Sequence, residues 1–179
     1  MPSETTYKLT TLDFSILGLL AQNPMSGYGI RMEFEKTALA SYSSSPGSIY
    51  PALKRLETWE MVSKEKVETK NTEVYKISKK GIEALTQWVI QPVTRNDIIR
   101  NKEVLLLRFA FMDILVAKRD KKRYLSSFRD ALTHYVKELE DFHATRISTM
   151  PLSGRQAFEF GLASNKHTIQ WIESILTKL

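Results

Sequence analysis

The 179-residue chain contains no cysteine. That absence excludes disulfide bonds, thiolate catalysis, zinc fingers and iron–sulfur clusters. A long apolar stretch is missing as well, because the longest apolar run, Phe14–Ala21, is far shorter than the roughly 20 residues that cross a bilayer. Residues 1–11 have neither the basic start nor the apolar middle of a signal peptide. These absences predict a cytoplasmic protein with no membrane partner.

Motifs of catalysis and nucleotide binding are also missing. The sequence has no Walker loop, no dinucleotide fingerprint and no serine within a nucleophile motif. The three histidines, His134, His143 and His167, all lie in the C-terminal half. Glu140 and His143 have the spacing of a carboxylate di-metal helix, but the motif has no second copy. We therefore expect no enzyme activity, no metal and no cofactor.

What the chain does have is a positive charge balance, with 26 basic and 20 acidic residues and a pI near 9.4. Divided after Arg95, the N-terminal part holds 12 basic and 10 acidic residues, and the remainder holds 14 and 10. A modest excess of this kind hints at a polyanionic partner. Binding to nucleic acid would have to come from local clustering of Lys and Arg rather than from the bulk charge.

The N-terminal half has the element order of a winged helix-turn-helix. Apolar spacing and turn residues predict helices at about 12–23, 28–39 and 49–59, strands at 62–67 and 74–77, and a helix at 79–91. Thr11 is the expected cap of the first helix and Ser78 that of the last. Ile82 is expected on the buried face of the last helix. The polar segment between the two strands would form the tip of a hairpin, the wing.

The C-terminal half contains only predicted helices. A polar, proline-interrupted stretch at 91–101 reads as a hinge, and residues 104–116 are apolar on almost every side, as in a helix buried all round. Two long helices follow at 119–149 and 153–179, the second opened by a capping box of Ser153 and Gln156. We therefore predict a mainly α fold with a small β-hairpin: a winged helix-turn-helix DNA-binding domain at 1–92 and a helical dimerisation domain at 93–179.

In the last helix, apolar residues recur at alternating steps of four and three, which is the spacing of a coiled-coil seam. A single polar residue on that seam, Asn165, would fix the register and the number of partners. The residues expected to form a homodimer are Phe158, Leu162, Asn165, Ile169, Ile172 and Leu176.

The third predicted helix has two different faces. Ile49, Leu53 and Leu56 form one apolar stripe, whereas Lys54 lies opposite it, flanked by Tyr50 and Arg55. Such a helix could enter a DNA major groove, where hydroxyls and helix N-terminal amides suit phosphate and cations suit phosphate or guanine. The other interpretation is that the two cations only solvate a surface helix.

The hairpin carries three lysines on or near its tip, but glutamates stand between them. It is therefore either a weak contact with the phosphate backbone or only a solvated hairpin. The candidate DNA-binding residues of the whole chain are Ser45, Ser48, Tyr50, Lys54, Arg55, Lys64, Lys66 and Lys70.

Three segments carry a family resemblance. Gly27–Ile30, Ser45–Glu57 (SPGSIYPALKRLE) and Val74–Gly81 resemble the PadR family of bacterial transcriptional regulators, and the C-terminal helices resemble the longer branch of that family. The family usually places a glycine just after the recognition helix, where this chain has Glu60. Its wing is usually rich in glycine and arginine, where this chain has Glu68–Glu73.

The resemblance implies a homodimeric winged-helix regulator that binds double-stranded DNA at an operator and represses or tunes a promoter. Because a dimer presents two recognition helices, we expect a palindromic operator. The resemblance also implies, in some members, release of the operator when a small hydrophobic or phenolic effector binds. The alternative from another functional class is a winged-helix protein-interaction module whose basic face docks an acidic protein partner.

Overall fold

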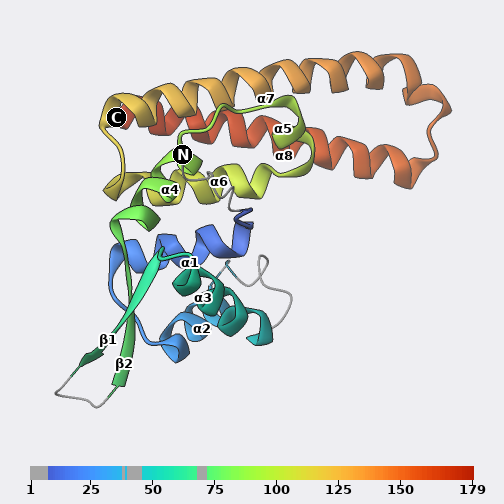
Figure 1. Ribbon diagram of the computed structural model, residues 1–179. Helices are drawn as coiled ribbons and strands as arrows, with labels where there is room; N and C mark the ends of the chain where they lie inside the picture. Colours follow the sequence, from blue (N-terminus) through green and yellow to red (C-terminus); the bar gives the residue numbers. More distant parts are fainter. Residues whose placement is uncertain (1–7, 38, 40–45, 68–71) are drawn as a thin grey trace, which may run out of the picture. The chain divides into compact units, whose positions relative to one another are not determined.

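The computed structural model describes residues 8–37, 39, 46–67 and 72–179, and the chain divides into two compact units, residues 1–89 and 90–179 (Figure 1). Ser45 and Lys70, both expected to contact DNA, lie outside the described residues. The boundary expected from the sequence falls three residues later, after residue 92. As a division between a DNA-binding and a dimerisation domain it stays a prediction.

The N-terminal unit has the order helix–helix–helix–hairpin–helix. Its elements are α1 (Thr11–Gln22), α2 (Gly27–Lys36), a 3₁₀ turn (Pro46–Ser48), α3 (Ile49–Thr58), β1 (Val62–Val67), β2 (Thr72–Ile77) and α4 (Lys79–Val89). The two strands pair antiparallel, with Val62 opposite Ile77 and Val67 opposite Thr72. Pro51 falls in the first turn of α3, where a proline removes no helical hydrogen bond. The predicted winged helix-turn-helix is thereby confirmed.

The helix starts of this unit are set by local polar contacts. Thr10, and not Thr11 as predicted, caps α1: the Asp13 amide donates to Thr10 Oγ1 (3.3 Å), and the Thr10 amide donates to Asp13 Oδ2 (2.8 Å). This reciprocal capping box ties the first turn together. Ser26 caps α2 and Ser78 caps the start of α4, each accepting one backbone N–H. The prediction for Ser78 is confirmed.

The core of the N-terminal unit is drawn from all four of its helices. Its fully buried aliphatic side chains include Ile16, Leu17, Ile30, Ile49, Leu53, Leu56 and Leu85. Phe14 of α1 stacks on Trp88 of α4, with ring centroids 4.5 Å apart. Two expectations are wrong: Ile82 is exposed on α4, and α2 ends at Lys36, whereas 39 was expected. Ile82 lies near the start of α4, whereas the buried side chains Leu85, Trp88 and Val89 all come from the second half of the helix.

The turn between α3 and β1 explains why the family favours glycine there. Glu60 has φ 58°, the left-handed region that suits glycine. The Glu60 amide donates to the Glu57 carbonyl (2.9 Å) and the Met61 amide to the Leu56 carbonyl (2.9 Å), so this conformation closes α3. In contact with this turn, Gly81 approaches Met61 so closely that a Cβ would lie 2.3 Å from the Met61 carbonyl oxygen.

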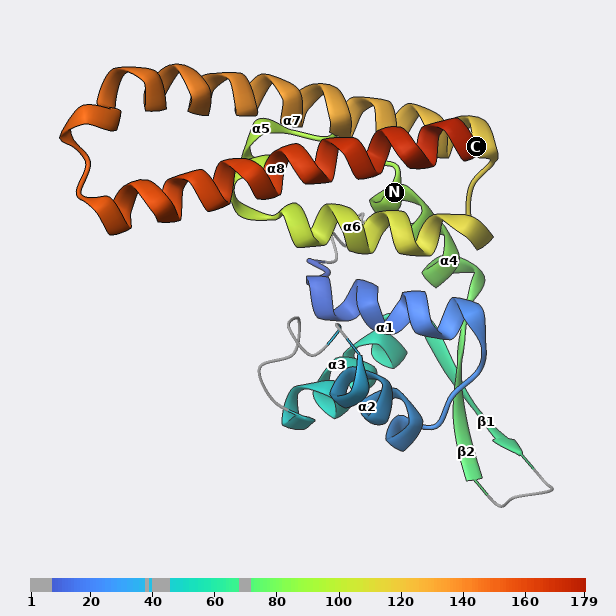
Figure 2. The same ribbon diagram turned by 180° about the vertical axis from the view of Figure 1, so that it is seen from behind.

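The C-terminal unit consists of helices. They are α5 (Arg95–Arg100), α6 (Lys102–Phe111), a 3₁₀ turn (Met112–Ile114), α7 (Lys118–Arg146), a second 3₁₀ turn (Ile147–Thr149) and α8 (Leu152–Lys178). Both views show α7 and α8 side by side and antiparallel, as a long helical hairpin (Figures 1 and 2). None of the helices in the described part of the chain combines the length and apolar character that a membrane span requires.

Three predictions for this unit need correction. The expected hinge at 91–101 contains the short helix α5, which a capping box of Thr94 and Asp97 starts. The predicted capping box of Ser153 is not formed, because α8 begins one residue earlier, after Pro151, without a side-chain cap. The helix expected to be buried on all sides, α6, is not, because Leu106 is exposed.

A buried polar contact joins α6 to α7. Arg108 is almost fully buried with its guanidinium 4.9 Å from the centre of the Tyr124 ring, and it donates to the Gln91 carbonyl. Tyr124 in turn donates to the Leu105 carbonyl (2.8 Å). Burial lowers the pKa of Arg108 and raises that of Tyr124. These groups therefore serve packing rather than titration near neutral pH.

Candidate nucleic-acid interface

Helix α3 carries the face that the sequence assigned to DNA. Ile49, Leu53 and Leu56 are buried in the N-terminal unit, as the apolar stripe predicted, whereas Lys54 is exposed and Tyr50 is 50% exposed. Ser48 is half-buried at the start of α3 and makes no side-chain cap to the helix. The buried stripe therefore fixes the helix and leaves Tyr50 and Lys54 directed outward.

The N-terminus of α2 packs directly on Tyr50. A Cβ on Gly27 would lie 2.8 Å from Tyr50 Cε1, so the absence of a side chain at position 27 lets the tyrosine ring lie against the helix start. Next to it on α2, Tyr28 is 60% exposed, and Arg31 lies over its ring at 5.3 Å. Neither Tyr28 nor Arg31 was among the DNA-binding residues expected from the sequence, so this exposed pair was missed.

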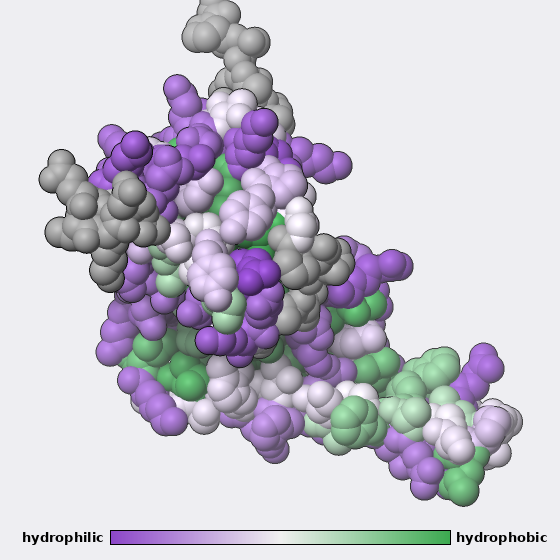
Figure 3. Space-filling view, turned by 90° about the horizontal axis from the view of Figure 1, so that it is seen from below, coloured by the Kyte–Doolittle hydropathy of each residue, from purple (hydrophilic) through white to green (hydrophobic). Residues whose placement is uncertain are grey.

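In Figure 1, α2, α3 and the hairpin form the lower side of the N-terminal unit, and Figure 3 views that side from below. Purple hydrophilic and pale, weakly polar side chains cover most of what is coloured there. A surface of this kind suits a charged, hydrated partner better than an apolar one.

Arg55 differs from Lys54 in having a protein partner. Its Nη2 donates to Oδ1 of Asp13 at 2.5 Å, and its guanidinium carbon lies 5.6 Å from the centre of the Trp59 ring. The Asp13 carboxylate is fully buried, whereas 35% of the Arg55 side chain is exposed. Arg55 therefore has a structural role in joining α3 to α1, and its predicted DNA contact stays a prediction.

On the wing, the lysines face acidic neighbours. Lys64 Nζ lies 3.9 Å from carboxylate oxygens of both Glu57 and Glu73. The interaction with Tyr75, and after it the negative charges of Glu57 and Glu73, raises the pKa of Lys64. Lys66 is exposed and stands opposite Glu73 in the strand register. The described part of the wing is thus close to charge-balanced, as its glutamates led us to expect.

The expected seam on α8 is only partly open to a second chain. Ile172 is fully buried within the chain, and it is the one buried residue of this entirely described helix. The side chains of Phe158, Leu162, Ile169 and Leu176 are each half-buried. Asn165 accepts a hydrogen bond from Lys102 Nζ of α6 (2.8 Å). Ile172 is therefore a core residue of the C-terminal unit, and the half-buried positions are the ones that a partner could cover.

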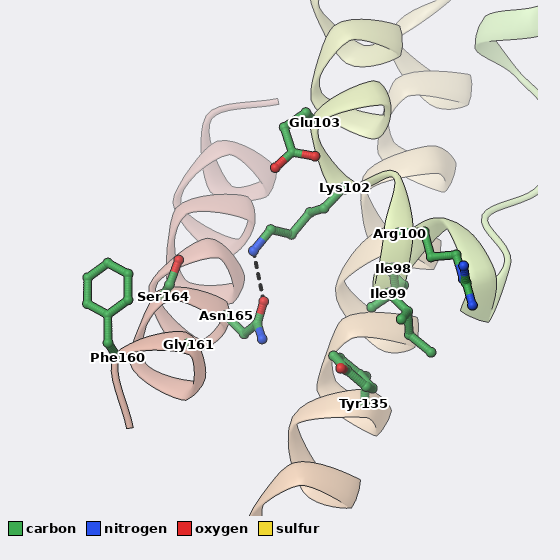
Figure 4. A pocket seen from close by; sticks show the side chains of 10 residues that line it. All are labelled: Ile98, Ile99, Arg100, Lys102, Glu103, Tyr135, Phe160, Gly161, Ser164 and Asn165. Carbon is green, nitrogen blue, oxygen red and sulfur yellow. Dashed lines mark hydrogen bonds between the residues drawn. The ribbon is translucent and has the colours of Figure 1, made fainter. Parts of the chain in front are cut away.

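A groove of about 330 Å³ lies beside this face, between the α5–α6 junction, α7 and α8. Figure 4 shows Lys102 reaching across it toward Asn165, with Ile98, Ile99 and Tyr135 on the other side. Within the described residues, Lys102 has no carboxylate partner. Arg100 and Glu103 also line the groove, which therefore combines two cations and one carboxylate with an apolar wall.

Comparisons with known proteins agree with the motifs. Residues 16–87 match the family described as "Transcriptional regulator PadR-like family". The chain is 25% identical to the negative transcriptional regulator PadR of Bacillus subtilis (strain 168), over 96% of this chain and 98% of the relative.

Solved structures of similar sequence include a PadR-like transcriptional regulator from Bacillus cereus (24% identity, 94% of this chain and 97% of that chain, TM-score 0.41). Bacillus subtilis PadR in complex with operator DNA is 21% identical over 94% of this chain and 99% of that chain, with a TM-score of 0.42. The same protein in complex with p-coumaric acid is 21% identical over 94% and 98%, with a TM-score of 0.43. The resemblance indicated by the sequence motifs is confirmed: residues 16–87 match the PadR-like family of transcriptional regulators, and the whole chain is similar to a PadR regulator.

Proposed function

We propose that this protein is a homodimeric, sequence-specific regulator that binds an operator and represses or tunes a promoter. The observation that carries the proposal is the outer face of α3: a helix fixed by a buried stripe in a winged helix-turn-helix, with Tyr50 and Lys54 exposed. In this motif the second helix of the turn enters the major groove and its side chains reach base edges and phosphates. The relative named as a negative regulator favours repression over activation.

The dimer is proposed from the C-terminal unit. An α-helix of 27 residues with one buried position leaves most of its surface uncovered, and Phe160 is 78% exposed. Covering the half-buried seam residues with a second copy would remove their remaining apolar surface from water. A dimer would place two α3 helices in successive major grooves about 10 base pairs apart, which predicts a palindromic operator.

The groove of the C-terminal unit is the proposed place for an effector. Lys102 and Arg100 suit a carboxylate, and Ile98, Ile99 and Tyr135 suit an apolar or phenolic body. We choose p-coumaric acid as the probe. Calorimetry should show binding to the wild type and at least tenfold weaker binding to Lys102→Met, which keeps the length of the chain without its charge. Equal binding of both variants would place the effector elsewhere.

The experiment that tests the DNA-binding function starts with selection of bound fragments from a random duplex library by the purified full chain. Enrichment of one palindromic sequence supports the proposal. The affinity for random DNA should also fall steeply with salt, because each lysine–phosphate contact releases a counterion. A chain without duplex affinity at any salt would instead be the alternative, a winged-helix module that docks an acidic protein.

A further inference from the structure

The partners of Arg55 suggest a role in reading sequence. Asp13 uses its two carboxylate oxygens for different purposes: Oδ2 accepts from Thr10 N and Thr10 Oγ1, both at 2.8 Å, and Oδ1 accepts from Arg55 Nη2 at 2.5 Å. One oxygen therefore caps α1 while the other holds the guanidinium of α3. Helix α1 is anchored in the core of the unit, with Ile16 and Leu17 fully buried. The Arg55 guanidinium is therefore bound to a carboxylate whose own position is fixed.

Two groups hold the Arg55 guanidinium: Asp13 binds one of its edges, and the Trp59 ring lies against one of its faces. Asp13 takes one N–H at Nη2, and the Trp59 ring lies 5.6 Å away. A guanidinium has five N–H donors, and within the described residues the Nε and Nη1 donors of Arg55 have no partner. With 35% of the side chain exposed, unused donors remain available in a fixed orientation.

A fixed guanidinium and a free ammonium contact DNA differently. Arginine donates two parallel hydrogen bonds to guanine O6 and N7, which discriminates among base pairs, and prior fixation reduces the conformational entropy lost on binding. Lys54 on the same helix is exposed and has no ion pair among the described residues, so its ammonium is a mobile point charge that suits phosphate. The two neighbouring cations are therefore suited to different tasks.

We propose that Asp13 is a positioning residue for base recognition: it orients Arg55 so that Arg55 reads a guanine within the operator. This inference rests on the proposed function, since it needs α3 to lie in a major groove. It assigns specificity to the Asp13–Arg55 pair and leaves the affinity for phosphate to other cations.

The test measures the dissociation constant of the full chain for the selected operator and for every single base-pair variant of it. Asp13→Asn keeps a capping oxygen but loses the charge that holds Arg55. The variant should lose roughly tenfold or more of its discrimination at one base pair in each half-site. Its affinity for random DNA should stay equal or rise, because a negative charge near the phosphates is gone. A purely structural role would lower the melting temperature and leave the discrimination of the folded protein intact.

Two further variants test base reading by Arg55 separately from the stability of α1. Arg55→Lys retains the charge without the planar fork and should lose discrimination at the same base pair. Thr10→Ala weakens the cap of α1 without touching Arg55, so it should lower stability and preserve discrimination. If Asp13→Asn does not fold, Arg55→Lys still tests whether Arg55 reads the base, and full discrimination in that variant overturns the proposal.

The outcomes distinguish a failure of the proposed DNA-binding function from a failure of the role of Asp13. A wild type that binds no duplex overturns the proposed function and this inference with it. A specific wild type whose folded Asp13→Asn or Arg55→Lys variant keeps full discrimination at every base pair overturns only the role of the Asp13–Arg55 pair. Loss at one shared base pair, with Thr10→Ala unaffected, supports it.

Discussion

The two units of the chain differ in how far they bury their own helices. In the N-terminal unit α1, α2, α3 and α4 each contribute to one core, and α3 alone buries four residues of ten. In the C-terminal unit α8 buries one residue of 27. The first unit buries the apolar stripes of its helices within one chain and presents a polar face, whereas α8 of the second unit is covered on one side by α7 and leaves the rest of its surface exposed. That difference supports the proposal that the first unit binds DNA and the second forms the dimer.

The largest effect is expected from a charge in the uncovered seam. Leu162→Asp should turn the dimer into a folded monomer, because the half-buried seam position cannot take a carboxylate out of water. Operator affinity should then fall by orders of magnitude, since the second recognition helix would have to bind independently. Light scattering and gel shift measure the two effects. Gln170→Asp on the exposed side of the same helix is the matched control. A Leu162→Asp variant that stays dimeric and binds the operator normally would show that the seam is not the dimer interface.

A second pair of variants separates the core of the C-terminal unit from its uncovered face. Ile172→Ala should lower the free energy of unfolding by about 2–5 kcal/mol, because Ile172 is fully buried within the chain. Phe160→Ala, at a side chain that is 78% exposed, should change the stability of the dilute monomer by no more than about 0.5 kcal/mol. Urea unfolding measures both. Equal losses in the free energy of unfolding would mean that Ile172 and Phe160 are equally buried in the monomer.

In the N-terminal unit, Lys54 and Arg55 should respond differently to alanine. Lys54→Ala should weaken operator binding by about 1–3 kcal/mol at an unchanged melting temperature. Arg55→Ala should also lower the stability, by about 1–3 kcal/mol, because Asp13 stays buried without its cation. Gel shift and thermal melting together distinguish them. The same melting temperature for both variants would show that the Asp13–Arg55 pair contributes nothing to the fold.

A smaller effect is expected from the hydroxyl of Tyr50. Tyr50→Phe should weaken operator binding by about 1 kcal/mol if the hydroxyl of this candidate DNA-binding residue meets a phosphate. The melting temperature should barely move, because the ring still packs against Gly27. Unaltered binding together with lower stability would make Tyr50 a structural residue only.

The smallest effect concerns Glu60, which is not among the residues proposed to contact DNA. Glu60→Gly should stabilise the N-terminal unit by about 0.5–1 kcal/mol, since φ 58° strains a residue with a Cβ. The substitution also removes the ion pair of Glu60 with Lys80 (3.8 Å), but this pair is exposed and contributes little to stability. Urea unfolding measures the gain, and Glu60→Ala, which keeps a Cβ, should show none.

The sequence predicted what depends on periodicity. The stripe of Ile49, Leu53 and Leu56 on α3 follows directly from helical spacing and is buried as expected. Helix α5 was missed because the polar stretch around it reads as a hinge, although Thr94 and Asp97 carry the signal of a capping box. That signal decides the local structure even in a short, proline-interrupted segment.

Contacts between distant residues could not be derived from a pattern. Arg55 and Asp13 are 42 positions apart, and a helical wheel places Arg55 at the edge of α3 without naming its partner. The heptad spacing of α8 likewise does not say which chain covers it. Within the chain, α7 packs along α8 and buries Ile172, so a seam that reads as an interface between copies is partly an intramolecular contact.

The most direct test of the account is the DNA sequence selected by the purified full chain from a random library. A homodimer that reads DNA with α3 should enrich an inverted repeat whose half-sites are centred about 10 base pairs apart. Inserting about five base pairs between the half-sites should abolish high-affinity binding, because the second half-site then faces the opposite side of the duplex. Enrichment of a single half-site, or binding that tolerates the insertion, would contradict the dimeric recognition proposed for this protein.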